Sequence, residues 1–88
     1  MAEHSVKLVY FAWVRERIGK MEEVVELPSN VQSVDALLQW LATRGDEYAA
    51  ALEFPEIIRV AIDQTHVEAD ASVLDAKEIA LFPPMTGG

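Results

Sequence analysis

The chain has 88 residues, of which 51% are apolar, and its 15 acidic and 7 basic side chains give a net charge of −8. This length supports one domain, and the apolar fraction lies well above that of disordered chains. No stretch approaches the roughly 20 apolar residues that span a bilayer. The acidic balance opposes nucleic-acid binding, which depends on Lys and Arg, and favours a basic protein partner. Because the chain has no cysteine, disulfides, thiolate metal sites and a cysteine nucleophile are excluded.

The first third of the chain predicts two strands joined by a short helix. Residues 1–5 contain no basic region followed by an apolar stretch, so we expect no secretory signal and a cytoplasmic protein. β-Branched and aromatic residues predict a central strand over 6–11 and a second strand over 22–27. Between them, residues 11–18 predict a short helical segment that ends at Gly19.

The middle of the chain predicts the main helix. Its apolar residues recur at helical spacing: Val34, Leu37, Leu38 and Leu41. Ser33 is placed to cap its N-terminal amides, and Gly45 is expected to supply a left-handed end. A second, shorter helical segment is expected around residues 48–52.

The last third predicts three further strands, over 57–62, 65–67 and 78–82, with a turn at Asp63-Gln64 between the first two. The resulting order, β-β-α-β-(β)-β, is that of an α+β fold in which one main helix covers a mixed sheet. Ubiquitin-like β-grasp domains use this order. We therefore expect a single ubiquitin-like β-grasp domain over residues 1–82.

Side chains suited to metal binding or acid–base catalysis are sparse. The two histidines, His4 and His66, have no recognisable ligand spacing, and no metal site is predicted. Four glutamates are expected to form a solvated sheet surface rather than an acid–base pair: Glu22, Glu23, Glu26 and Glu68. Only four glycines are present and two are terminal, which argues against a phosphate-binding loop. We expect no bound cofactor, and any ATP would be bound by a partner.

Residues 83–88 predict an extended, flexible tail whose free carboxylate is the candidate reactive group. The tail consists of Pro83, Pro84, Met85, Thr86, Gly87 and Gly88. The prolines stiffen the start of the tail. The glycines have no side chain and could enter a narrow active site. Fully extended, the six residues would reach about 20 Å from the domain. Adenylation would activate the Gly88 carboxylate, and the acyl-adenylate could then pass to sulfur, giving a thiocarboxylate, or to an amine, giving an isopeptide.

A candidate docking surface lies beside the tail. If Ile79 and Leu81 face the helix, strand alternation sends Phe82 to the opposite face. The same reasoning turns Phe11 outward from the first strand, so that the two rings could form an exposed patch that docks a partner. Arg15 could orient that partner. The alternative is that both rings belong to a thicker core or are covered by the short helix.

Three segments resemble the family of small, sulfur-carrier subunits of molybdopterin synthase: Phe11-Ala12-Trp13-Val14-Arg15-Glu16, Asp63-Gln64-Thr65 and Phe82-Pro83-Pro84-Met85-Thr86-Gly87-Gly88. The resemblance covers almost the whole chain. It implies that an E1-like enzyme adenylates Gly88, that a sulfur donor protein supplies the sulfur of a thiocarboxylate, and that the tail enters the large synthase subunit. There the sulfur would pass to cyclic pyranopterin monophosphate to build the dithiolene of molybdopterin.

The resemblance also implies a division of labour between subunits. Phe11 and Phe82 match family positions that pack against the partner, and the catalytic side chains would belong to the large subunit of a heterotetramer. The chain itself would be a sulfur-donating subunit that does not catalyse the transfer.

The chain departs from the family pattern at two positions, neither of them in the tail. Ala76 replaces the glycine that the family commonly has before the last strand, which disfavours a positive φ there. His66 occupies a place that is often apolar, so the contact surface should be more polar or pH-sensitive. Three alternatives stay open: a sulfur carrier for thiazole or tRNA thiolation, a ubiquitin-like protein modifier, and a purely structural interaction domain.

Overall fold

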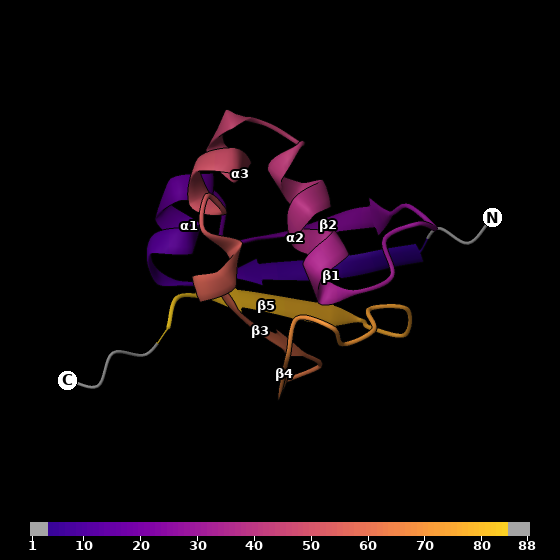
Figure 1. The fold of residues 1–88 in the computed structure, drawn as a ribbon. Helices are drawn as coiled ribbons and strands as arrows, with labels where there is room; N and C mark the ends of the chain where they lie inside the picture. The colour runs from indigo at the N-terminus through magenta and orange to yellow at the C-terminus, as the bar shows by residue number, and fades with distance from the viewer. Residues whose placement is uncertain (1–3, 85–88) are drawn as a thin grey trace.

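A computed structural model describes residues 4–84 of the chain (Figure 1). The elements in chain order are β1 (His4–Tyr10), α1 (Ala12–Ile18), β2 (Glu22–Leu27), α2 (Val34–Ala42), α3 (Asp46–Ala51), the 3-10 turn η1 (Pro55–Ile57), β3 (Arg59–Ile62), β4 (Thr65–Val67) and β5 (Glu78–Phe82). Of the helices within residues 4–84, none has the length and apolar character needed to cross a membrane.

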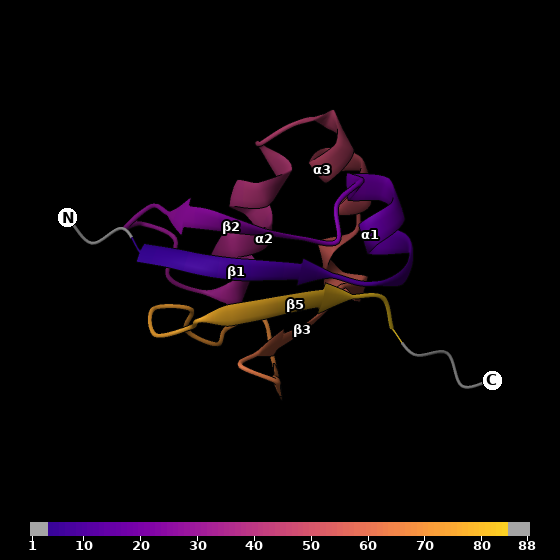
Figure 2. The same cartoon turned by 180° about the vertical axis from the view of Figure 1, so that it is seen from behind.

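The five strands form one mixed sheet in the order β2-β1-β5-β3-β4. The two central strands, β1 and β5, are parallel, with Leu8 opposite Ile79, while the other neighbouring pairs are antiparallel. The helices lie on one face of the sheet, and the view from behind shows the other face uncovered (Figures 1 and 2). This is the predicted α+β β-grasp arrangement.

The core lies between the sheet and α2. Alternate residues of the central strands point into it, and Leu8, Ile79 and Leu81 are each 0% exposed. From the helix side, Leu37 and Leu41 are equally buried. The period-2 pattern of the strands and the helical spacing of α2 therefore meet at one apolar layer, as the sequence predicts.

α2 begins as predicted and ends differently. The Ser33 hydroxyl accepts a hydrogen bond from the Ala36 amide at 3.1 Å, which is the expected N-cap. The prediction that Gly45 ends this helix in the left-handed conformation is wrong. Thr43 closes the last turn instead, with its hydroxyl donating to the Trp40 carbonyl at 2.6 Å, and Gly45 has extended backbone and serves as the N-cap of α3.

The hairpin between β3 and β4 confirms the predicted turn. Asp63 and Gln64 both have positive φ, 49° and 73°, as a two-residue hairpin requires. The Asp63 carboxylate also accepts hydrogen bonds from the amides of Lys77 and Glu78. Ala76 is not among the positive-φ residues, and it packs into the core at 3% exposure.

β1 begins at His4, two residues before the predicted start, and two further strand boundaries differ from the prediction at the other end of the sheet. The strand expected over 57–62 begins at Arg59, because Pro55 starts a 3-10 turn in which the Ile57 amide bonds to the Phe54 carbonyl. The first strand ends at Tyr10, and Phe11 becomes the N-cap of α1. Both differences occur at the end of the sheet from which the tail departs (Figure 1).

Candidate functional site

The candidate site begins where β5 ends. Phe82 is the last residue of this central strand, and Pro83 and Pro84 follow it outside the strand and half-buried. The tail therefore departs from the middle of the sheet (Figure 2). Met85, Thr86, Gly87 and Gly88 lie outside the described residues, so the reactive role of Gly88 stays a prediction.

Phe11 and Phe82 lie at the ends of neighbouring strands, beside the departing tail. Phe11 is 47% exposed, and its amide donates to the Leu81 carbonyl at 3.1 Å, which continues the β1–β5 ladder. Phe82 is half-buried, while Leu81 next to it is fully buried. The two rings therefore lie outside the helix-covered core, and the alternative of a thicker core that encloses them is wrong.

His66 lies beside Phe82, and its predicted role in binding a partner stays a prediction. It lies on the edge strand β4, two strands away from β5, yet its ring centroid is 5.8 Å from that of Phe82, at an angle of 46°. The rings meet across β3, where Ala61 is paired with both His66 and Ala80. The small side chain of Ala61 on the strand between leaves room for the rings to lean over it.

Arg15 and Arg59 lie beside this surface, and only Arg15 was predicted from the sequence. Arg15 is exposed on α1, the helix that follows Phe11. Arg59 was missed, although it stands directly opposite Phe82 in the β3–β5 ladder and is exposed. Its position follows from strand register, which the sequence pattern alone does not supply.

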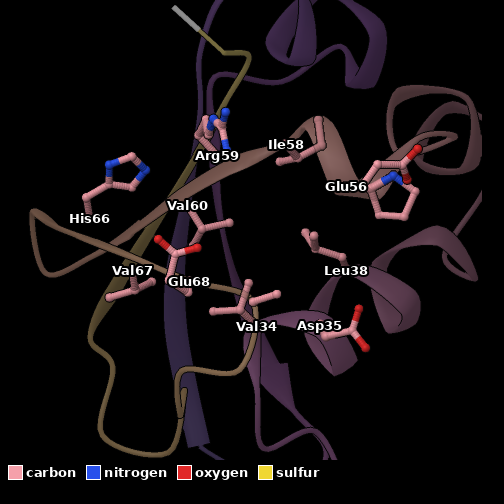
Figure 3. Close-up of a pocket in the computed structure, with 12 residues that line it drawn as sticks. Val34, Asp35, Leu38, Glu56, Ile58, Arg59, Val60, His66, Val67 and Glu68 are labelled. Atoms are coloured by element: carbon pink, nitrogen blue, oxygen red, sulfur yellow. The ribbon is translucent and has the colours of Figure 1, made fainter.

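A groove of about 340 Å³ lies between α2 and the β3–β4 hairpin (Figure 3). Its lining residues are Val34, Asp35, Leu38, Pro55, Glu56, Ile58, Arg59, Val60, His66, Val67, Glu68 and Ala69. The floor is apolar and the exposed carboxylates stand at the rim. Within residues 4–84, no three His, Asp or Glu side chains come together in a way that could hold a metal ion.

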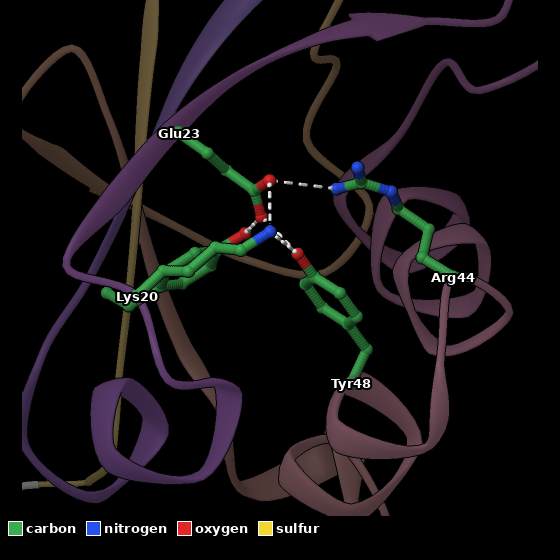
Figure 4. A network of polar contacts seen from close by, with 5 residues as sticks. Lys20, Glu23, Arg44 and Tyr48 are labelled. Carbon is green, nitrogen blue, oxygen red and sulfur yellow. Dashed lines mark hydrogen bonds and ion pairs between the residues drawn. The ribbon is translucent and has the colours of Figure 1, made fainter.

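Glu23 is not part of a solvated sheet surface, and that prediction is wrong. Its side chain is only 13% exposed and lies on the helix-covered side (Figure 4). The hydroxyls of Tyr10 and Tyr48 donate to its Oε2 at 2.7 and 2.6 Å. Lys20 Nζ and an Arg44 guanidinium nitrogen each lie 3.3 Å from its Oε1.

The surroundings of Glu23 keep it ionised. Burial raises the pKa of this carboxyl, but hydrogen bonds from Tyr48 and Tyr10 and the charge of Arg44 outweigh burial and lower the pKa overall. Burial and the hydrogen bond to Glu23 raise the pKa of Tyr10, and the hydrogen bond to Tyr48 helps raise the pKa of Lys20. The cluster ties β1 and β2 to α3, so its role is structural.

The chain matches the model of one family, the ThiS family, over residues 8–88. It belongs to that family. It is 39% identical to the molybdopterin synthase sulfur carrier subunit of Escherichia coli over 83 residues, which cover 94% of this chain and 99% of that protein. The corresponding protein of Haemophilus influenzae is 37% identical over the same shares of both chains.

Solved structures share the fold. A putative molybdopterin converting factor, subunit 1, from Pyrococcus furiosus is 25% identical, with a TM-score of 0.65 over 92% of this chain and 98% of that one. SAMP1 from Haloferax volcanii is 23% identical, with a TM-score of 0.70 over 97% of this chain and all of its own. At 23% identity, the likeness to SAMP1 concerns the fold alone.

Proposed function

We propose that this chain is the sulfur carrier subunit of a molybdopterin synthase. One observation carries the proposal: the chain is 39% identical, over almost its full length, to a protein of that name. The exposed ring of Phe11 and the half-buried ring of Phe82 beside the departing tail support it, since a carrier must present its tail and a docking surface at the same place.

The tail supplies the sulfur. The Gly88 carboxylate attacks the α-phosphorus of ATP in an E1-like partner, forming an acyl-adenylate and releasing pyrophosphate. Hydrosulfide supplied by a donor protein then attacks the carbonyl carbon, forming the C–S bond as the bond to AMP breaks, and loss of its proton gives the thiocarboxylate. Transfer of that sulfur to cyclic pyranopterin monophosphate returns the carboxylate, with its oxygen supplied by water, and two transfers complete the dithiolene.

The folded domain positions the tail and leaves catalysis to its partners. Glu23 is held ionised by its hydrogen bonds and its cationic neighbours, so it offers no proton at neutral pH. The surface formed by Phe11, Phe82 and His66 docks the large subunit, whose active site receives Gly88. The adenylating enzyme binds the ATP.

The proposal is tested by the intact mass of the chain after incubation with the activating enzyme, ATP and a sulfur donor. We expect the increment that corresponds to replacing one oxygen by sulfur, located on the C-terminal peptide. Deletion of Gly88 should abolish the increment and leave the circular dichroism spectrum and melting temperature unchanged. An unchanged mass in the full-length chain would contradict the proposal.

The other functions left open by the sequence give different products. A carrier for thiazole or tRNA thiolation would form the thiocarboxylate but would not support molybdopterin formation with the large subunit. A protein modifier would accumulate as lysine-linked adducts. A purely structural domain would behave identically with and without Gly87 and Gly88.

A further inference from the structure

We infer that the docking surface extends beyond Phe11, Phe82 and His66 onto the connection from α3 to β3, through Phe54, Ile57 and Arg59. The occupant is the large synthase subunit, which would cover these residues with an apolar rim that carries a carboxylate opposite Arg59. This inference rests on the proposed function and specifies the surface through which it acts.

The position of this connection follows from strand register. Arg59, the first residue of β3, is paired with Phe82, the last residue of β5. Residues 54–58 therefore run beside the point where the tail departs. Figures 1 and 2 show the same arrangement, with η1 beside the arrowhead of β5 at the end of the sheet from which the tail departs.

The connection exposes apolar side chains that packing within the domain does not explain. Phe54 is 56% exposed and Ile57 is 39% exposed, while Ile58 next to them is buried at 7%. Large apolar groups clustered at one end of a monomer typically mark an interaction surface. Here they continue the surface that already includes Phe11, at 47% exposure.

The tail is short, so a partner whose active site receives Gly88 must also cover the end of the domain from which the tail departs. Six residues extend at most about 20 Å, so a protein that surrounds Gly88 has a wall within that distance of Phe82. A stable subunit contact buries about 800 Å² on each partner, whereas one aromatic side chain supplies only about 150–250 Å². The contact therefore needs more apolar surface than Phe11, Phe82 and His66 offer.

The ion pairs within the domain indicate which charge the large subunit carries opposite Arg59. Lys7, Lys20 and Arg44 each form an ion pair with a glutamate of β2. Arg59 forms none with any residue in the range 4–84, although the chain as a whole has a net charge of −8. An exposed, unpaired guanidinium beside an apolar patch is suited to a partner carboxylate, which it binds through two parallel hydrogen bonds.

The chain offers matched controls at the opposite end of β5. Lys77 is an exposed cation that immediately precedes β5, about 17 Å from Phe82 along the strand. Leu74 is 49% exposed in the loop that precedes β5, and this loop lies at the opposite end of β5 from the tail (Figure 1). Arg59→Glu can thus be compared with Lys77→Glu, and Phe54→Ser with Leu74→Ser.

The test is the affinity of each purified variant for the large subunit, measured by calorimetry at two salt concentrations. We expect Phe54→Ser and Arg59→Glu each to weaken binding about tenfold, which corresponds to about 1.4 kcal/mol. Arg59→Glu should also change the salt dependence of the affinity. Lys77→Glu and Leu74→Ser should stay within about twofold of the unmodified chain, and all four should melt cooperatively.

Equal losses in test and control variants, or no loss in either, would overturn the inference. So would a loss of Gly88 thiocarboxylation in Phe54→Ser or Arg59→Glu with unchanged affinity for the large subunit, because the surface would then serve the activating enzyme. A thiocarboxylated, unmodified chain that does not bind the large subunit would instead contradict the proposed function, and the inference would fall with it.

Discussion

The two faces of the sheet differ in what covers them. On the helix side, Leu8, Ile79 and Leu81 are fully buried, and the polar groups of the Glu23 cluster satisfy one another. On the other face and at the tail end, Phe11 is half exposed and His66 is exposed against the ring of Phe82. The same strands therefore hold the domain together on one face and carry the proposed docking surface on the other.

Because the two faces differ, inward residues of β5 should contribute to stability and outward residues of the same strand to partner binding. Leu81 and Phe82 are adjacent in sequence, yet one lies in the core and the other on the docking surface. Because strand residues alternate between faces, substitutions one position apart should have opposite consequences. The predictions below use this separation, beginning with the largest effect.

Leu81→Ala should destabilise the domain without altering the chemistry of the tail. Removing a fully buried leucine side chain costs about 2–5 kcal/mol, because it loses apolar burial and leaves a cavity. Urea unfolding measures the loss. At low temperature, where the variant stays folded, thiocarboxylation of Gly88 should proceed as in the unmodified chain, and a loss of both properties together would break the separation.

Phe82→Ala should have the complementary effect. Because the ring is only half-buried, its loss should cost about 1 kcal/mol of stability, but affinity for the large subunit should fall about 30-fold or more, as for an aromatic anchor. Calorimetric titration with the large subunit measures this. Unchanged affinity would show that the outer face is not the docking surface.

Glu23→Gln should destabilise the helix-covered side by about 2 kcal/mol, since it weakens hydrogen bonds to a charged group. Because the folded-state pKa of Glu23 is lowered, its stabilising contribution is present above the ordinary value of 4.5 and is lost as the pH falls through the lowered pKa. The stability difference between the two chains should therefore be constant near neutral pH and shrink in acid. Binding to the large subunit should not change.

The contact between His66 and Phe82 should be the weakest of these effects. Tilted aromatic pairs contribute about 0.5–1.5 kcal/mol beyond the area they bury. A double-mutant cycle with His66→Ala and Phe82→Ala, measured by urea unfolding, should give a coupling energy of about 0.5 kcal/mol. Additive losses would show that the two rings do not support each other.

Much of the fold could be predicted because local signals agree with the tertiary structure. The helical spacing from Val34 to Leu41 and the Ser33 cap predicted α2, and the Asp63-Gln64 pair predicted its hairpin. Strand alternation placed Phe82 outward. The prediction failed at the end of α2, where Thr43 closes the last turn through its hydrogen bond to the Trp40 carbonyl and Gly45 begins α3 instead.

The candidate site was predictable only in part, because contacts between segments far apart in the sequence determine which residues meet there. Phe11, Phe82 and His66 could be found from alternation and from resemblance to a family. Arg59 could not, because its place beside Phe82 depends on the register of two strands, in which these two residues pair although they are 23 positions apart in the sequence. Glu23 looked like one more surface glutamate, and only folding brings Tyr10, Tyr48 and Arg44 to it.

The central claim is that this chain carries sulfur on Gly88 into a synthase. It is tested most directly by mixing the purified thiocarboxylated chain with the large subunit and cyclic pyranopterin monophosphate, and following intact mass and product together. The account predicts that the chain returns to its carboxylate mass as molybdopterin forms. Retention of the thiocarboxylate without product would contradict it.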